Sequence, residues 1–227
     1  MNTQQLAQVS EELEGKSAQD VISWAVDTFA EKLAIGTSLG AEAMVIMDMV
    51  TRIQPDAPFI FLDTDFHFAD TLGLLEEVKQ RYNLNIIVAR PELSPQQQAE
   101  QYGDQLFFHD PGQCCEIRKL GPMRRQLAPF EAWITGMRRD QNAFRTGLGH
   151  AIRDDKFDLI KVNPLIHWTW DDVWHYIDTN DVPYNRLHRM GYPSIGCAPC
   201  TQPVKPGEDL RAGRWSGFDK TECGLHK

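Results

Sequence analysis

The sequence predicts an α/β fold: an open, mostly parallel sheet with helices on both faces, followed by an irregular C-terminal segment. Two observations predict it. Short apolar runs alternate with longer stretches of helical periodicity, and this alternation is typical of parallel strands joined by crossover helices. In addition, 42% of the 227 residues are apolar, which is enough for the core of one large domain or of one domain with an appendage.

Five apolar runs are expected to form the strands. The run at 33–35 leads into a glycine-containing loop and then a helix, and the run at 58–62 is also followed by a helix. Further runs lie at 85–89, 132–135 and 159–162. Each run is short and apolar, as buried parallel strands are, so we expect all five in one sheet.

The helices are predicted from their periodicity and from their first turns. Ser17 is followed by Asp20, and Thr169 by Asp172, and both pairs match a capping box at the start of a helix. The expected helices are a short polar one at 4–14, one beginning at Ser17, one at 41–53, one at 69–82 and one beginning at Thr169.

The helical signal stops after about Pro183. Residues 191–227 contain Gly, Pro, Arg and three of the five cysteines, with little periodic apolar pattern. We therefore divide the chain into an α/β domain over 1–190 and a cysteine-bearing segment over 191–227. This segment needs something to order it.

The charges are unevenly distributed along the chain. The 23 Lys and Arg against 32 Asp and Glu give a net charge of −9, which disfavours nonspecific binding to nucleic acids. Residues 114–153, however, contain eight basic and three acidic side chains, a balance of +5 that leaves −14 for the rest. Such a segment suits a small anionic ligand better than a long polyanion, although a solvated basic face would give the same count.

The sequence shows neither a secretory signal nor a membrane span. The first basic residue is Lys16, and no run approaches the 18 apolar residues that a spanning helix needs. We therefore expect a cytoplasmic protein with no membrane partner. Its five cysteines are then expected to be reduced thiols, suited to metal binding, redox chemistry or nucleophilic attack rather than to a disulfide framework.

Polar segments follow three of the predicted strands, where ligands bind in open parallel sheets. Residues 37–42 read Thr-Ser-Leu-Gly-Ala-Glu and can present backbone N–H groups to an anion, although an ordinary strand-to-helix turn is an equally good interpretation. Residues 62–65 carry two carboxylates that can hold a sugar or a cation, or cap the next helix. Residues 136–145 hold three arginines, whose planar forks suit phosphate or sulfate.

The cysteines are arranged as a vicinal pair, a C-x-x-C pair and one near the C-terminus. Cys114 and Cys115 together with Cys197 and Cys200 can close a four-thiolate site, and spacing alone leaves iron–sulfur and zinc open. A thioredoxin-like C-x-x-C is weaker, because the pair lies in an irregular segment. Cys223 is either a nucleophile or an incidental surface cysteine.

Together these motifs identify a family resemblance. The chain resembles the assimilatory adenylylsulfate reductases, the iron–sulfur branch of the adenylylsulfate/phosphoadenylylsulfate reductase family, which has the adenine nucleotide α-hydrolase-like fold of PP-loop type. The matching segments are Cys114-Cys115-Glu116-Ile117-Arg118-Lys119, Gly136-Met137-Arg138-Arg139-Asp140-Gln141, Cys197-Ala198-Pro199-Cys200-Thr201, Arg211-Ala212-Gly213-Arg214-Trp215 and Glu222-Cys223-Gly224-Leu225-His226. One difference is Asp65, where many members have Gly after Leu-Asp-Thr.

The resemblance implies a [4Fe-4S] cluster and a nucleophilic cysteine. The cluster ligands would be Cys114, Cys115, Cys197 and Cys200. Cys223 would attack the sulfur of adenylylsulfate, release AMP and hold an S-sulfonate, from which thioredoxin releases sulfite. Residues 1–190 would then be the nucleotide-binding domain, and 191–227 a mobile catalytic tail. The pathway implied is sulfate assimilation and cysteine biosynthesis, and a homo-oligomer is allowed.

The resemblance also implies a set of substrate-binding residues. Lys119 would link the cluster and the substrate electrostatically, and Glu42 would disfavour a 3′-phosphate. The full set is Ser38, Gly40, Glu42, Asp63, Thr64, Lys119, Arg138, Arg139, Arg145, Arg211 and Arg214.

Three alternatives remain. The nearest is a reductase of 3′-phosphoadenylylsulfate, or of both nucleotides. An ATP pyrophosphatase of the same fold would normally carry Ser-Gly-Gly-x-Asp-Ser, which residues 38–43 do not match. A non-catalytic iron–sulfur sensor would need a surface that binds its target, commonly nucleic acid. Both the net charge of −9 and the fifth cysteine argue against such a sensor.

Overall fold

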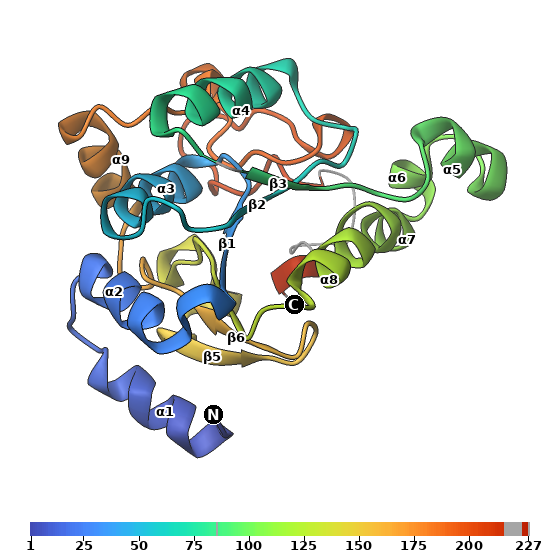
Figure 1. Ribbon diagram of the computed structural model, residues 1–227. Helices are drawn as coiled ribbons and strands as arrows, with labels where there is room; N and C mark the ends of the chain where they lie inside the picture. Colours follow the sequence, from blue (N-terminus) through green and yellow to red (C-terminus); the bar gives the residue numbers. More distant parts are fainter. Residues whose placement is uncertain (85, 216–223, 227) are drawn as a thin grey trace.

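A six-stranded sheet forms the centre of the computed structural model, which describes residues 1–84, 86–215 and 224–226 (Figure 1). The strand order is β3-β2-β1-β4-β6-β5; all neighbouring strands are parallel except β5, which runs antiparallel to β6. The strands are β1 (Leu33–Thr37), β2 (Phe59–Leu62), β3 (Ile86–Ala89), β4 (Ala132–Ile134), β5 (Ala151–Asp154) and β6 (Leu159–Val162). The predicted mostly parallel sheet is confirmed.

Strand β5 is the one element of the sheet that the apolar pattern did not predict. Its second half is Arg153-Asp154, and it lies at the edge, so it needs no continuous apolar run. Helix α1 (Thr3–Glu12) packs against this edge, and the backbone N–H of Ala151 donates to Oγ of its Ser10 at 3.2 Å. An edge protected in this way does not template pairing with another chain.

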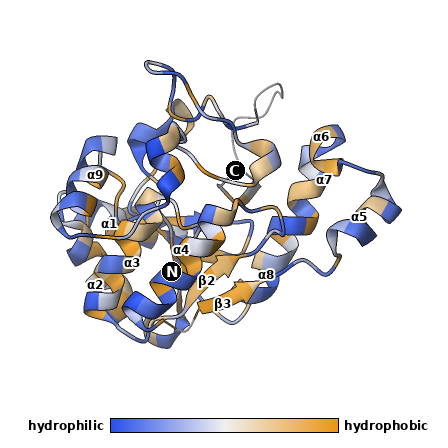
Figure 2. Ribbon diagram, turned by 90° about the horizontal axis from the view of Figure 1, so that it is seen from above, coloured by the Kyte–Doolittle hydropathy of each residue, from blue (hydrophilic) through white to orange (hydrophobic). Residues whose placement is uncertain are grey.

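Successive strand residues point to opposite faces of the sheet and so build two apolar clusters. In β1, Leu33 and Ile35 belong to the larger cluster and Ala34 to the smaller one. Helices α2 (Ala18–Phe29), α3 (Ala41–Ile53), α4 (Ala69–Tyr82) and α9 (Trp170–Thr179) cover the larger cluster. Helix α8 (Gly121–Leu127) covers the smaller one through Met123 and Leu127. Figure 2 shows β2 and β3 as hydrophobic strands among helices of mixed polarity.

The predicted helices and their caps are present. Ser17 accepts a hydrogen bond from the N–H of Asp20, and Thr169 accepts one from the N–H of Asp172; in both pairs the aspartate accepts in return from the capping residue. These reciprocal bonds satisfy N–H groups that have no partner inside the helix.

The segment between β3 and β4 contains helices that the periodicity did not predict. They are α5 (Pro95–Tyr102), α6 (Leu106–His109), α7 (Pro111–Cys115), a π-helical turn η2 (Glu116–Leu120) and α8. Each is short, and prolines at 95, 111 and 122 begin three of them, so no long amphipathic pattern develops. The π turn carries Lys119 directly after the vicinal cysteines, and such turns are frequent at functional sites.

The described part of 191–227 is irregular, as predicted. It contains the short 3-10 turns η6 (Ala198–Cys200) and η7 (Gly224–His226), and a single bridge between Thr201 and Arg214. The remaining 3-10 turns are η1 (Ala30–Lys32), η3 (Arg139–Gln141), η4 (Ala143–Arg145) and η5 (Arg186–Met190). The domain boundary at residue 190 stays a prediction. Among the described residues, no helix combines the length and the apolar character needed to cross a membrane.

Candidate active site

A cavity of about 220 Å³ opens at the carboxyl ends of β1, β2 and β4. One wall is apolar, because Ile60, Met123 and Trp133 from the smaller core cluster line it. Gly36 makes room for this wall: a Cβ there would lie 3.0 Å from two carbons of the Trp133 ring. The predicted site residues that line the cavity are Ser38, Gly40, Glu42, Thr64, Lys119, Arg138, Arg145, Arg211 and Arg214.

The loop after β1 lines the cavity with Thr37, Ser38 and Gly40 and leads into the N-terminus of α3. Leu39 has a φ of +57°, a conformation that costs energy for a bulky residue, and its N–H donates to Thr37 Oγ1 at 3.3 Å. Gly40 is the N-cap of α3 and supplies no side chain, so the first N–H groups of this 13-residue helix have no side-chain cap. A helix N-terminus of this kind favours an anion.

Arg138 is held against Glu42 at the base of the cavity. Its side chain is 1% exposed and donates to Glu42 Oε1 through Nε at 3.1 Å, and Gln141 Nε2 donates to the same oxygen at 2.9 Å. The second side of the guanidinium pairs with Asp140 at 3.0 Å. The charge of Glu42 is therefore balanced, and the repulsion expected from it toward a 3′-phosphate is weakened.

Arg145, Arg211 and Arg214 extend the cationic lining, and the contacts of Arg145 and Arg214 show how such a side chain is held. Arg145 is buried and contacts Gln141. Arg214 lies on the ring of Trp215, with its guanidinium carbon 4.5 Å from the ring centroid, and donates to Ser194 Oγ at 3.2 Å. These contacts fix the directions in which the guanidinium groups face the cavity.

Lys119 and Cys197 line both this cavity and a second, smaller one. The second cavity is lined by all four cysteines of the predicted cluster. In the chain, 81 residues separate Cys115 from Cys197, so the fold brings the two pairs together. Thr64 Oγ1 lies 3.3 Å from Cys197 Sγ and also borders the first cavity. The thiols and the anion-binding surface are therefore neighbours.

Two of the four thiols have raised pKa values. Burial first, and then the neighbouring cysteines, raise the pKa of Cys114 to about 11. The same causes raise the pKa of Cys200 to about 11, although Lys119 and Arg214 oppose the shift. Thiolates in this position need a bound cation, which is what a metal centre supplies.

The spacing of the sulfurs bears on the kind of centre. Tetrahedral zinc with Zn–S bonds of about 2.3 Å brings its sulfurs within roughly 3.8 Å of one another. In the described part of the chain, the only group of three metal-ligating side chains whose ligand atoms all lie within 4.8 Å contains no cysteine. No three of the four cysteine sulfurs therefore lie mutually within 4.8 Å of one another.

Asp65 accounts for the departure from the family pattern after β2. Its φ is +59°, so it adopts the left-handed conformation that Gly adopts freely and that Asp tolerates better than most residues. Its carboxylate accepts from Arg118 Nη1 at 2.7 Å, and Arg118 is 1% exposed. The aspartate thus fixes this loop to the helical segment that carries Lys119.

Two predicted substrate ligands lie outside the cavity lining. Arg139 points away from it and donates to Glu14 at 3.0 Å and to the carbonyl of Leu148 at 2.8 Å. Asp63 pairs with Arg90 at 3.4 Å. The structure does not bring either side chain to the other predicted ligands.

Cys223, the predicted nucleophile, lies outside the described residues. Of the residues near it in the chain, 224–226 are described. Leu225 lines the large cavity, and the carbonyl of Gly224 accepts from Lys156 Nζ. The C-terminal turn η7 therefore contacts the site.

Sequence reasoning missed several residues of the site. Gln141 belongs to the segment Gly136-Met137-Arg138-Arg139-Asp140-Gln141. Its position directly after a run of charges at a strand end would have identified it as a site residue. Ile60, Met123 and Trp133 gave no signal, because apolar residues on a strand or helix look like ordinary core.

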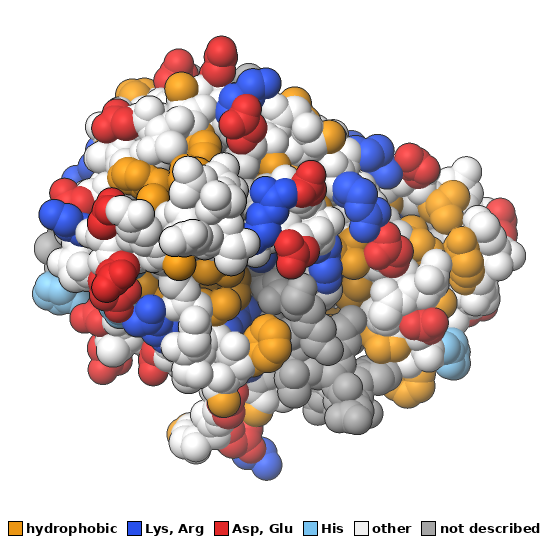
Figure 3. Space-filling model, turned by 90° about the horizontal axis from the view of Figure 1, so that it is seen from below, with side chains coloured by type: hydrophobic (Ala, Val, Ile, Leu, Met, Phe, Trp, Pro, Cys, Tyr) orange, Lys and Arg blue, Asp and Glu red, His pale blue; other side chains and the backbone are white. Residues whose placement is uncertain are grey.

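Charges of both signs are interspersed on one face of the molecule. On the face shown in Figure 3, Lys and Arg side chains lie among Asp and Glu side chains. The net charge of −9 is therefore not gathered into one acidic field on this face. The cations around the cavity act locally, within about a Debye length of 8 Å at physiological salt.

Comparison with known proteins decides the family. Residues 32–203 match the phosphoadenosine phosphosulfate reductase domain. The chain belongs to this reductase family. The match covers the sheet, both cavities in large part and the C-x-x-C pair, and it confirms the PP-loop-like adenine nucleotide α-hydrolase fold.

Individual relatives agree with the assignment to this reductase family. The chain is 51% identical over 221 residues to adenosine 5′-phosphosulfate reductase of Halalkalibacterium halodurans, covering 97% of this chain and 96% of the relative. It is 50% identical over 219 residues to the protein of the same name from Shouchella clausii, covering 96% and 91%. A crystal structure of phosphoadenylyl-sulfate reductase from Candida auris, in a phosphate complex, has 31% identity and a TM-score of 0.77, covering 88% of this reductase and 97% of that chain.

Proposed function

We propose that this protein reduces adenylylsulfate to sulfite and AMP, with thioredoxin as the electron donor, in sulfate assimilation. The observation that carries the proposal is the adjacency of the two cavities. A cation-lined cavity at the strand ends shares Lys119 and Cys197 with a cavity lined by four cysteines. The curated relatives at about half identity are named as adenosine 5′-phosphosulfate reductases.

The cavity suits each part of the substrate. The apolar wall of Ile60, Met123 and Trp133 suits a purine ring. The N-terminus of α3 and the arginines Arg138, Arg145 and Arg214 suit the phosphosulfate, because backbone N–H groups and guanidinium forks bind oxyanions. Arg139 is better described as a support of this loop than as a ligand, since it bonds to Glu14 and Leu148.

We propose that Cys114, Cys115, Cys197 and Cys200 hold a [4Fe-4S] cluster. The donor set fits, because four buried or half-buried thiols line one cavity and two of them have raised pKa values that a metal centre would offset. When bound, the cluster supplies a fixed charge distribution beside Lys119. Lys119 would orient the sulfate group between that charge and the arginines.

The chemistry proposed for the chain begins with the thiolate of Cys223. The thiolate attacks the sulfur of the sulfate group, the bond from that sulfur to the bridging oxygen breaks, and AMP leaves with the electron pair. Negative charge grows on the leaving phosphate, where Arg138, Arg145 and Lys119 would stabilise it. An S-sulfonated Cys223 remains.

Release of sulfite requires two electrons from an external dithiol. One thiolate of thioredoxin attacks Sγ of Cys223, sulfite leaves with the electron pair of the S–S bond, and the second thiol of thioredoxin resolves the mixed disulfide. Cys223 must therefore meet first the substrate and then a protein, so we propose that the C-terminal segment moves between the two steps. A reducing compartment, the cytoplasm, suits both the thiols and this donor.

The direct test is sulfite formation from adenylylsulfate with reduced thioredoxin, compared with the same assay on 3′-phosphoadenylylsulfate. We expect kcat/KM to be higher for the unphosphorylated nucleotide. Higher turnover of the phosphorylated one would reassign the substrate, and the ion pair of Glu42 with Arg138 makes that comparison informative. No sulfite from either nucleotide would overturn the proposed function.

A further inference from the structure

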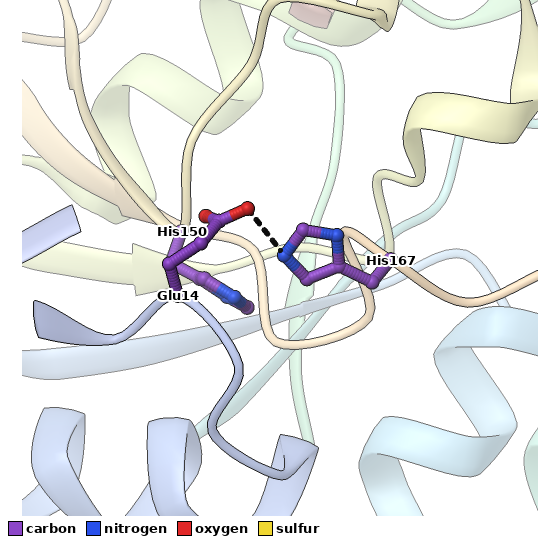
Figure 4. Close-up of side chains that lie close together, drawn as sticks. All are labelled: Glu14, His150 and His167. Atoms are coloured by element: carbon purple, nitrogen blue, oxygen red, sulfur yellow. Dashed lines mark ion pairs between the residues drawn. The ribbon is translucent and has the colours of Figure 1, made fainter. Parts of the chain in front are cut away.

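Three side chains that line neither of the cavities above converge beside strand β5. Glu14 follows α1, His150 precedes β5, and His167 lies between β6 and α9. Figure 4 shows the three side chains directed toward one another from these segments. One ligand atom of each lies within 4.8 Å of the other two, and in the described part of the chain no other group of three metal-ligating side chains is as close.

His150 has a buried nitrogen without a hydrogen-bond partner. The side chain is 1% exposed, and Nδ1 lies 3.1 Å from the carbonyl oxygen of Asn163. A carbonyl only accepts, so Nδ1 carries the proton and Nε2 has a free lone pair. Within the described structure this Nε2 is buried and unpaired. A histidine whose other ring N–H is bound to a backbone carbonyl is the usual arrangement of a metal ligand.

Glu14 and His167 complete the group on its solvent side. His167 Nε2 lies 2.9 Å from Glu14 Oε1, and Arg139 Nη1 contacts the same oxygen at 3.0 Å. Arg139 Nη1 also lies 3.3 Å from His167 Nδ1. Both Glu14 and His167 are more than a third exposed, so an ion can enter from solvent.

We propose that Glu14, His150 and His167 form a second metal site, for a divalent ion of borderline softness such as Zn²⁺. Two imidazoles and one carboxylate are a common ligand set for such ions, and a water would take the fourth position. The lone pair of His150 Nε2 then gains the partner that it lacks among the described protein atoms.

The site implies a competition between the metal and Arg139. In the present arrangement the guanidinium is the cation that Glu14 and His167 share. Coordination through His167 Nε2 moves the ring proton to Nδ1, which then faces the donating guanidinium, so Arg139 must turn away. Metal binding therefore releases Arg139, which directly precedes Asp140 and follows the cavity residue Arg138.

The test is a titration of the cluster-loaded protein with Co²⁺, without substrate. We expect one ion to bind with the weak visible bands of nitrogen and oxygen ligands and without an intense thiolate charge-transfer band, which would mark binding to cysteine. His150→Ala should weaken binding by about tenfold or more, the scale on which even outer partners of metal sites act. Arg139→Gln should tighten binding, because it removes the competing cation.

His175, an exposed histidine of α9, provides the control, and His175→Ala should bind as the wild type does. If the His150→Ala variant fails to fold, His167→Ala at its exposed position replaces it in the test. This variant should also weaken cobalt binding. Two results would overturn the proposal. One is that cobalt binds only to cysteines or does not bind. The other is that the wild type and the folded His150, His167 and Arg139 variants bind cobalt with equal affinity. Because no substrate is used, either result would leave the proposed reductase activity untouched.

Discussion

Gly196→Ala should impair substrate binding through one arginine and leave the fold intact. An added Cβ would lie 2.6 Å from the guanidinium carbon of Arg214 and closer still to Nη2. Such an approach is far below van der Waals contact, so something must move. The part that moves is the end of a long side chain rather than backbone, and Arg214 is therefore expected to turn out of its place on Trp215.

The size of the effect follows from the contact that would be lost. A hydrogen bond between an arginine and an oxyanion contributes about 1.5–3 kcal/mol, and each 1.4 kcal/mol is a factor of ten. We therefore expect kcat/KM for adenylylsulfate to fall roughly 10- to 150-fold. The free energy of unfolding should change by less than about 1 kcal/mol, since alanine also reduces the freedom of the unfolded chain.

The assay is sulfite release at varied substrate, with iron content measured in parallel because Cys197 follows Gly196 directly. Arg214→Met should cause a similar loss, and the double variant should lose little more, since both changes remove one interaction. Gly73→Ala in α4, where an added Cβ meets nothing within 4 Å, is the matched control. Unchanged kcat/KM in Gly196→Ala, or losses that multiply in the double variant, would refute the reasoning.

Three further outcomes are expected. Cys223→Ser should abolish sulfite formation and keep the brown chromophore, and an active variant would remove the nucleophile from that position. Cys197→Ser should lose iron and activity together, whereas bound zinc without broad absorbance near 400 nm (roughly where iron–sulfur absorption lies) would contradict the cluster. Burial lowers the pKa of His67 and of His188. Below about pH 6.5 the unfolded chain then binds more protons than the folded one, so the free energy of unfolding should fall as the pH drops. Denaturant titrations at pH 7.5 and 5.5 measure this, and His67→Gln should reduce the difference.

The parallel part of the sheet was predictable because its strands read as continuous apolar runs, and most residues of the central β1 and β2 are buried. Strand β5 was not, because an edge strand that α1 and Ser10 cover can end in Arg153-Asp154. The helices between β3 and β4 were also not predicted. Their turns are held by tertiary contacts such as that of Arg118 with Gln98 at 2.8 Å, which no local pattern reveals.

The grouping of the candidate site residues came from the family resemblance and not from the residues alone. Residue types and spacing left zinc and iron–sulfur open, since nothing local relates the vicinal cysteines to the C-x-x-C pair. The resemblance also grouped Arg138 with Arg139. The structure separates them, because adjacent residues of an extended segment point in opposite directions: Arg138 has φ −130° and ψ 144°, and Arg139 reaches Glu14 instead of the cavity.

The position of Lys119 explains why a chain of charge −9 carries a basic segment in its middle. Lys119 is 7% exposed and borders both cavities. A buried ammonium is costly unless negative charge lies close to it. An anionic nucleotide in one cavity and metal-bound thiolates in the other would place such charge on both of its sides. A non-catalytic sensor with the same four cysteines would not need the arginines that line the first cavity together with Lys119, and this arrangement therefore favours a reductase in which the metal centre and the substrate act on a shared cation.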